Sequence, residues 1–195
     1  MDTRTQLLDA AEELFAERGY NGTSIRAVTN LAGANLAAVG YHFGSKAELL
    51  AAVARRVIEP INNAQREGLD RLLGRTAEPT VAELVEAFTG PMFDGMPAGD
   101  ERSVRRSRLL VTILGDPADE VRNWMGPVED AVRDRYLEAF RRALPELPIE
   151  ELWFRIKGVL AVTTVDRLEP QGDAARRWAV TFLAAALSAP PTAPD

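Results

Sequence analysis

Apolar residues recur at helical spacing along most of the chain, and this periodicity limits the fold more than any other feature. One such set, near the start of the chain, is Leu7, Leu8, Ala11, Leu14 and Phe15. A helix places residues with this spacing on one face. No segment alternates with a period of two between hairpin turns; VLAVTTV, residues 159–165, comes nearest, and we interpret it as a buried helix. The sequence therefore predicts an all-α protein of about nine helices, three short ones followed by a larger bundle.

Turn and capping residues divide the opening of the chain into short helices. Thr23 is a good N-cap for a helix over residues 24–30, and Asn35 is a good N-cap for one over residues 36–41. Gly33 is the turn residue between them. Two short helices joined by a tight turn that contains glycine form a helix-turn-helix, whose second helix enters the major groove of DNA.

Longer helices are expected after this segment. Ser45 begins a helix that continues to about residue 73, with Pro60 as a kink. Further helical patterns follow from residue 81 onward. We expect three parts, namely a helix-turn-helix DNA-binding domain (1–47), a larger helical domain (48–188), and a flexible, proline-rich tail (189–195).

The carboxylates are distributed unevenly. The chain carries 29 acidic and 23 basic residues, for a net charge of −6, yet no aspartate or glutamate occurs from Arg18 through Ala47. An acidic protein repels phosphate over most of its surface. A window without carboxylates therefore indicates a protein that meets a polyanion such as DNA at one place only.

The residue inventory excludes several classes of enzyme. The chain has no cysteine, so it has no disulfide, thiolate metal site or cysteine nucleophile. Its single histidine, His42, lies in the window without carboxylates, and no glycine-rich phosphate loop or Glu-x-x-His motif is present. We expect no enzymatic activity, cofactor or metal; an acid–base site built from aspartate and glutamate alone stays open.

Neither end of the chain reads as an export or membrane signal. The N-terminal segment MDTRTQLLDAAEELF is charged and amphipathic, unlike a signal peptide. The longest apolar run near the C-terminus, residues 179–187, is about half the length of a membrane span. A cytoplasmic protein is therefore expected.

The segment AAEELFAERGYNGTSIRAVTNLAGANLAAVGYHFGSKAEL closely resembles the DNA-binding domain of the TetR family of transcriptional regulators. The resemblance covers about residues 5–50, a quarter of the chain. Its matches occur in order, from the Ala-Ala…Leu-Phe helix through Gly19-Tyr20, Thr23-Ser24-Ile25 and Ala32-Gly33 to Tyr41-His42-Phe43 and Ser45-Lys46.

The resemblance implies roles for particular residues. Tyr41 and His42 match positions that contact the DNA backbone, and Lys46 matches a direct phosphate partner; such contacts set register rather than sequence. Thr23, expected at a helix N-terminus, suits a phosphate oxygen. The complete set of expected DNA-binding residues is Thr23, Ser24, Arg26, Asn35, Leu36, Ala37, Gly40, Tyr41, His42 and Lys46.

Base recognition is less clear from the sequence than backbone contact. Gly40 stands where the family often has a tyrosine. The base-facing candidates Leu36, Ala37 and Gly40 can pack against thymine methyl groups or allow close approach, but none can make a bidentate contact to guanine. Sequence reading then falls to Arg26, Thr29 or DNA shape.

The remainder of the chain resembles, more weakly, a subgroup of the family that includes fatty-acid-responsive repressors. Methionine and aromatic residues gather in its middle third, and such clusters suit adaptable apolar cavities; ordinary core packing is the alternative. One nearby arginine could pair with a ligand carboxylate. The expected ligand-binding residues are Phe88, Met92, Phe93, Met96, Arg106, Leu110, Trp124 and Met125.

The last two predicted helices have broad apolar faces. Two such helices from each of two chains form a four-helix interface, as the family implies; core packing within one chain is the competing explanation. The expected interface residues are Trp153, Ile156, Leu160, Trp178 and Phe182.

These features together predict a homodimeric transcriptional repressor that binds a palindromic operator in double-stranded DNA. A small apolar or acyl-type ligand would release it by shifting the two recognition helices. An activator with the same fold, and a helical interaction module without DNA binding, are the alternatives.

Overall fold

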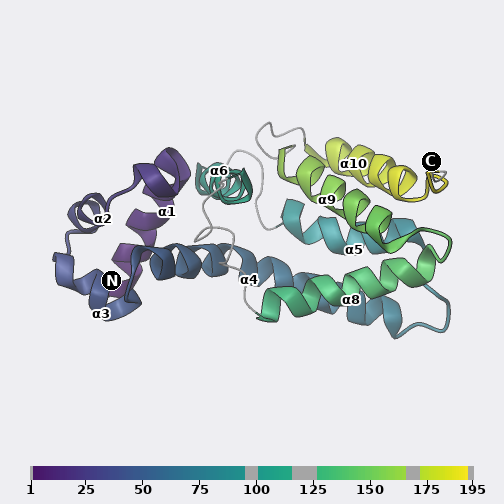
Figure 1. Ribbon diagram of the computed structural model, residues 1–195, viewed down its shortest axis with the longest axis horizontal. Coiled ribbons are helices and arrows are strands. Elements are labelled where there is room, and N and C mark those ends of the chain that lie inside the picture. The colour runs from purple at the N-terminus through teal and green to yellow at the C-terminus, as the bar shows by residue number, and fades with distance from the viewer. Residues whose placement is uncertain (1, 95–100, 116–126, 166–171, 193–195) are drawn as a thin grey trace. The chain divides into compact units, whose positions relative to one another are not determined.

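The computed structural model describes residues 2–94, 101–115, 127–165 and 172–192. Within these ranges the chain forms helices and no strand, which confirms the all-α prediction (Figure 1). The segment VLAVTTV lies in a helix, as expected. The helices are α1 (Thr3–Gly22), α2 (Ile25–Ala32), α3 (Leu36–Phe43), α4 (Lys46–Leu73), α5 (Val81–Asp94), α6 (Glu101–Gly115), α8 (Pro127–Ala143), α9 (Ile149–Val165) and α10 (Gly172–Leu187).

The chain divides into two compact units. The first comprises residues 1–60 and 99–126, and the second comprises residues 61–98 and 127–195. The boundary falls at Pro60, inside α4. The first unit contains α6 in addition to α1–α3, so it extends beyond the predicted domain over residues 1–47.

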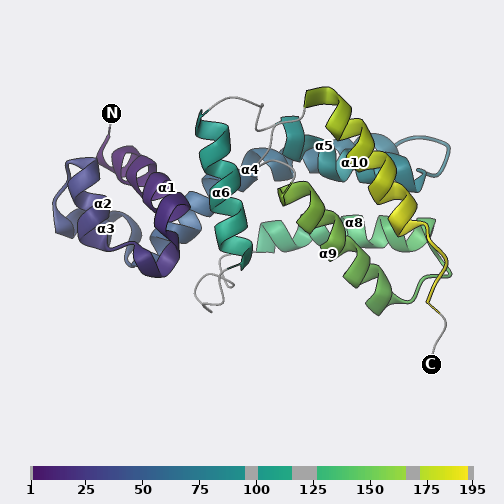
Figure 2. The ribbon, with the colours of Figure 1, turned by 90° about the horizontal axis from the view of Figure 1, so that it is seen from above.

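The first unit is organised around α1, which packs against α2, α3 and α6 (Figure 2). Its core contains the buried side chains of Leu7, Phe15, Val28, Val39 and Leu49. These come from four helices, which explains why each short helix has a fixed place although isolated helices of eight residues are unstable in water.

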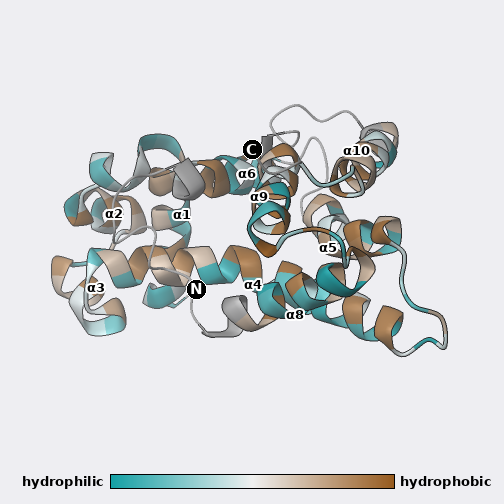
Figure 3. Cartoon of the chain, turned by 45° about the vertical axis from the view of Figure 1, so that its right-hand side comes forward, coloured by the Kyte–Doolittle hydropathy of each residue, from teal (hydrophilic) through white to brown (hydrophobic). Residues whose placement is uncertain are grey.

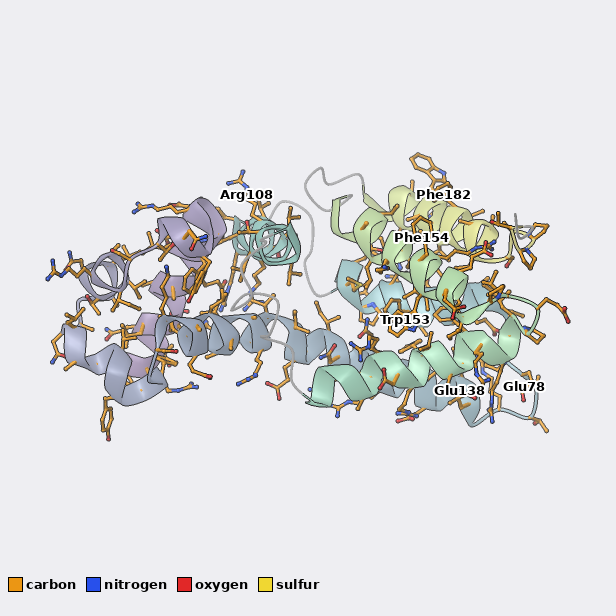
Figure 4. The ribbon with its side chains drawn as sticks, viewed as in Figure 1. Glu78, Arg108, Glu138, Trp153, Phe154 and Phe182 are labelled. Atoms are coloured by element: carbon orange, nitrogen blue, oxygen red, sulfur yellow. The ribbon has the colours of Figure 1, made fainter. Side chains whose placement is uncertain are left out.

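Ion pairs join α1 to α6 within the first unit. The Glu12 carboxylate is almost fully buried, and its Oε1 lies 3.4 Å from Arg106 Nε and 3.9 Å from Arg102 Nε. Glu13 Oε2 lies 3.4 Å from Arg105 Nη1. A buried carboxylate needs such partners because its desolvation is otherwise unfavourable. Three arginines of α6 therefore pair with α1, whereas the fourth, Arg108, is exposed (Figure 4).

The second unit has its own apolar core, where α5 packs against α8, α9 and α10. Phe88, Tyr136 and Phe140 form an aromatic cluster, with the Phe88 and Tyr136 ring centroids 4.9 Å apart. The Tyr136 hydroxyl donates to the Gln65 carbonyl at 2.8 Å, and burial raises the pKa of Tyr136. Brown, hydrophobic residues form stripes along these helices in Figure 3, as amphipathic helices require.

The segment after α10 is anchored to α9. The Arg155 guanidinium donates to the carbonyls of Leu187, at 2.8 Å, and Ala189, at 2.6 Å, and so caps α10. Glu151 pairs with Arg155, which lowers the pKa of that carboxyl, and accepts from the Thr192 amide at 3.1 Å. Residues 189–192 of the predicted tail are thus held by hydrogen bonds.

None of the helices in the described ranges combines the length and the apolar composition that a bilayer crossing needs.

Candidate nucleic-acid interface

The turn between α1 and α2 is held by Thr23. Gly19 adopts a φ of 68°, which breaks the helical path of α1 four residues before Thr23. The Thr23 side chain turns inward, with 2% of its surface exposed, and its hydroxyl lies 3.0 Å from the Leu14 carbonyl and 2.8 Å from that of Gly19. This hydroxyl is occupied within the protein and does not face a phosphate.

The N-cap of α2 is Ser24, so the prediction of Thr23 as the cap is wrong. The Ser24 hydroxyl accepts from the Ala27 amide at 3.1 Å. Both residues carry a hydroxyl suited to capping, but only Thr23 lies where α1 supplies buried carbonyl acceptors. Ser24 and Arg26 are exposed, whereas Thr29 is buried and donates to the Arg26 carbonyl at 3.1 Å.

The recognition helix α3 begins at the predicted cap. Asn35 Oδ1 accepts from the Ala38 amide at 2.9 Å, which confirms Asn35 as the N-cap. Val39 is buried against the rest of the unit. The opposite face is exposed and carries Leu36, Ala37, Gly40 and Tyr41.

Aromatic residues cluster at the C-terminal end of α3. Tyr41 is 86% exposed, and its ring meets the His42 imidazole edge-on at a centroid distance of 4.9 Å. Phe43 is partly buried, and the Arg4 guanidinium lies 5.3 Å from its ring centroid. Arg4 thus adds a cation beside this cluster. Arg4 was not among the predicted DNA-binding residues, because its contact with Phe43 joins residues far apart in the chain.

Lys46, the first residue of α4, holds its ammonium group 4.2 Å from the centre of the Tyr20 ring. A cation over an aromatic face is attracted by the ring quadrupole. This contact explains how a flexible lysine is directed to one place at the start of a helix, near the turn that Tyr20 belongs to. Ser45 caps α4 through the Glu48 amide at 3.1 Å, as predicted.

Three carboxylates of α1 are paired with arginines within the first unit, whereas that of Glu17 is exposed. Asp9 Oδ1 lies 2.5 Å from Arg56 Nη2, and Glu12 and Glu13 pair with α6 as described above. Together with the absence of carboxylates from residues 18–47, this arrangement leaves α2 and α3 with an exposed surface that suits a polyanion.

The predicted ligand-binding residues fall into three groups. Phe88, Met92 and Phe93 lie on α5 in the second unit, where Phe88 and Met92 are buried. Arg106 and Leu110 lie on α6 in the first unit, and the Arg106 guanidinium is engaged by Glu12. The remaining three lie outside the described residues, namely Met96, Trp124 and Met125.

The predicted dimer residues divide between core and surface. Ile156 is buried and Leu160 packs against the core, so Ile156 is not available to a partner. Trp153 is partly buried and lies toward α8, where Arg133 stands 5.5 Å from its ring centroid (Figure 4). Trp178 and Phe182 of α10 are 65% and 61% exposed.

Phe154 of α9, which the sequence analysis missed, is 73% exposed and is labelled with Phe182 in Figure 4. Helical periodicity places Trp153 and Phe154 about 100° apart. Either side chain could therefore face the core, and the sequence does not distinguish between them.

Family models match both parts of the chain. Residues 7–53 match the model of bacterial regulatory proteins of the tetR family, and residues 86–186 match the model of the tetracyclin repressor-like C-terminal domain. The chain belongs to the TetR family. The resemblance noted from the opening window is thereby confirmed, and so is the assignment to DNA-binding transcriptional regulators.

Individual relatives agree with this assignment. The transcriptional repressor KstR2 of Rhodococcus jostii is 30% identical over 174 residues, covering 83% of this chain and 84% of that protein. The transcriptional activator FasR of Mycolicibacterium smegmatis is 35% identical over 172 residues. That match covers 70% of this chain and 78% of the FasR chain. The TetR-family regulator PfmR of Thermus thermophilus has a similar fold, with a TM-score of 0.61, 21% identity and coverage of 99% and 100%.

Replacing Thr23 tests the structural role of its hydroxyl. Thr23→Val keeps the shape but leaves the carbonyls of Leu14 and Gly19 without this donor, so we expect a loss of about 1–2 kcal/mol in the free energy of unfolding. Thr23→Ser keeps the hydroxyl and serves as the matched control. Urea unfolding followed by circular dichroism measures both, and equal stability of Thr23→Val and wild type would contradict the assignment.

Proposed function

We propose that this TetR-family protein is a homodimeric repressor that binds a palindromic operator through α2 and α3 and leaves it when a small apolar or acyl-type ligand binds. Its activity is binding rather than catalysis, and it takes place in the cytoplasm, where DNA is accessible. The observation that carries this proposal is the exposed face of α3 in a region without carboxylates, with Tyr41 beside His42 at its C-terminal end and Lys46 three residues after the helix.

The phosphate contacts follow from the positions of these groups. The exposed Tyr41 phenol and the neighbouring imidazole can donate hydrogen bonds to phosphate oxygens, and Lys46 supplies a positive charge at the N-terminus of α4, where free amides favour anions. Arg26 and Ser24, both exposed on α2, stand on the preceding helix. Such contacts orient α3 in the groove.

A dimer is supported by the aromatic surface of α9 and α10. Phe154, Trp178 and Phe182 are each more than half exposed, and the two helices that carry them pack against each other. Exposed large apolar side chains on neighbouring helices mark interaction sites. Gly158 on α9 has open space where a Cβ would lie, which permits close approach of another helix. A second copy of the chain is the proposed occupant.

A ligand site in the second unit is supported by one buried polar group. Asn62 of α4 is only 8% exposed, and its Nδ2 has no hydrogen-bond partner among the described residues. One turn further on, Gln65 donates to the Phe88 carbonyl at 2.7 Å. Buried polar groups are nearly always hydrogen-bonded. An apolar ligand with a carbonyl or carboxylate would supply the acceptor that Asn62 lacks.

Transcriptional activation by the same DNA-binding surface is the second candidate function, because FasR, among the relatives, is an activator. The contacts with DNA would be the same for either outcome.

DNA binding is tested by selecting duplexes from a random pool with the immobilised protein. We expect enriched inverted repeats, and we expect Lys46→Ala to weaken their binding and to reduce the slope of log affinity against log salt by about two, one for each protomer of the dimer. Tyr41→Ala should weaken binding as well. Arg71→Ala, which removes an exposed cation of the second unit, is the control and should bind as wild type. Fluorescence anisotropy at several salt concentrations measures these affinities. Failure to enrich any sequence, or wild-type binding by both variants, would overturn the proposal.

Dimerisation is tested by charge substitution on α9. Phe154→Glu should convert a dimer to a monomer with an unchanged helical content, because a carboxylate would be buried without a partner in the interface. Leu73→Glu changes an exposed apolar residue at the end of α4 and serves as the control. Sedimentation velocity reports the mass of each species. A monomeric wild type, or a dimeric Phe154→Glu variant, would rule out this interface.

A further inference from the structure

The exposed face of the recognition helix is almost entirely apolar. Leu36, Ala37, Gly40 and Tyr41 are the exposed residues of α3, and at about 100° per residue they occupy one continuous face. Leu36 is 52% exposed. At the N-terminal end of this face, where recognition helices meet base edges, the side chains are an isobutyl group and a methyl group.

Of the candidate base readers Arg26 and Thr29, Arg26 is exposed on α2, whereas Thr29 and two nearby polar side chains make hydrogen bonds within the protein. The Thr29 hydroxyl is buried and donates to the Arg26 carbonyl, and the Thr23 hydroxyl is buried against α1. Asn35 uses its Oδ1 to cap α3. On α3, the exposed side chains that can contact base edges are therefore those of Leu36 and Ala37.

Only one base presents an apolar group in the major groove. Thymine carries its C5-methyl there, whereas the edges of guanine, cytosine and adenine present hydrogen-bond donors and acceptors. A leucine pressed against those edges would remove them from water without offering a partner, which is unfavourable. Leu36 and Ala37 thus favour thymine and disfavour G·C pairs at the positions they meet.

Neither the packing nor the backbone conformation at Gly40 requires a glycine. A Cβ added there meets no atom within 4 Å, and its φ is not in the left-handed region, unlike those of Gly19, Gly33 and Gly44. Glycine inside a helix is less stable than alanine by about 1 kcal/mol. The open space lies one turn from Leu36 on the exposed face, where an external group can approach the backbone.

We propose that Leu36 and Ala37 read the operator by packing against thymine C5-methyl groups in the major groove, and that Gly40 leaves room for the base edge. This inference rests on the proposed DNA-binding function and adds the chemical group that gives the binding its sequence preference. The region without carboxylates around α3, with Tyr41 and Lys46 as anchors, provides the charge complementarity that brings this apolar face to DNA.

Replacing single thymines by deoxyuridine in a selected duplex tests the inference on the wild-type protein. The substitution removes the C5-methyl and keeps every hydrogen-bonding group. We expect one or two thymines in each half-site to be sensitive. Each single substitution at such a thymine should lower affinity about fourfold, which corresponds to the burial free energy of one methyl group. Leu36→Ala should lower affinity for the thymine duplex and abolish the difference between thymine and deoxyuridine at the position that Leu36 meets, while any difference at the position that Ala37 meets remains. Leu31→Ala on α2, where Leu31 is 51% exposed, is the matched control and should retain the difference at both positions.

The Gly40→Ala variant provides a second test of the inference. It should raise the unfolding temperature, because alanine favours the helix, and yet weaken binding to the selected duplex. The inference is overturned if the duplex binds specifically but no deoxyuridine substitution changes affinity by twofold; the proposed DNA-binding function would then stand. If no duplex is bound specifically, the proposed function and the inference fail together.

Discussion

The buried hydroxyl of Thr23 holds the turn on which the arrangement of the first unit depends. Its contacts with the carbonyls of Leu14 and Gly19 fix where the chain leaves α1. Ser24 can then cap α2, and the left-handed Gly33 directs the chain into α3. The exposed face of α3 is thus positioned by a hydrogen bond outside the helix-turn-helix itself, together with the packing of both short helices on α1.

Charge pairing gives the same unit its surface character. The acidic residues Asp9, Glu12 and Glu13 of α1 are each engaged by an arginine from α4 or α6. Pairing neutralises carboxylates close to the proposed DNA surface, whereas the net charge of −6 discourages binding elsewhere. The pairing also ties α6 to α1, so α6 belongs to the unit that carries the recognition helix.

Helices, most caps and the helix-turn-helix could be predicted from the sequence because they depend on local periodicity and capping chemistry. Predictions that depended on tertiary contacts fared less well. Thr23 and Ser24 are chemically equivalent caps until α1 supplies acceptors for one of them. Arg106 was expected at a ligand but meets a buried glutamate 94 residues away in the chain. Phe154 and Ile156 are both apolar, and only the packing of α9 against its neighbours decides which is exposed.

Hydrogen-exchange mass spectrometry, with and without a selected duplex, tests the central claim that DNA meets this protein at one face. We expect slower exchange in peptides that cover the N-terminal ends of α2 and α4, where amides would meet phosphates, and in α3, which would lie in the major groove, with unchanged exchange in α5 and α8. Protection confined to the second unit, or no protection between residues 24 and 46 at saturating duplex, would contradict it.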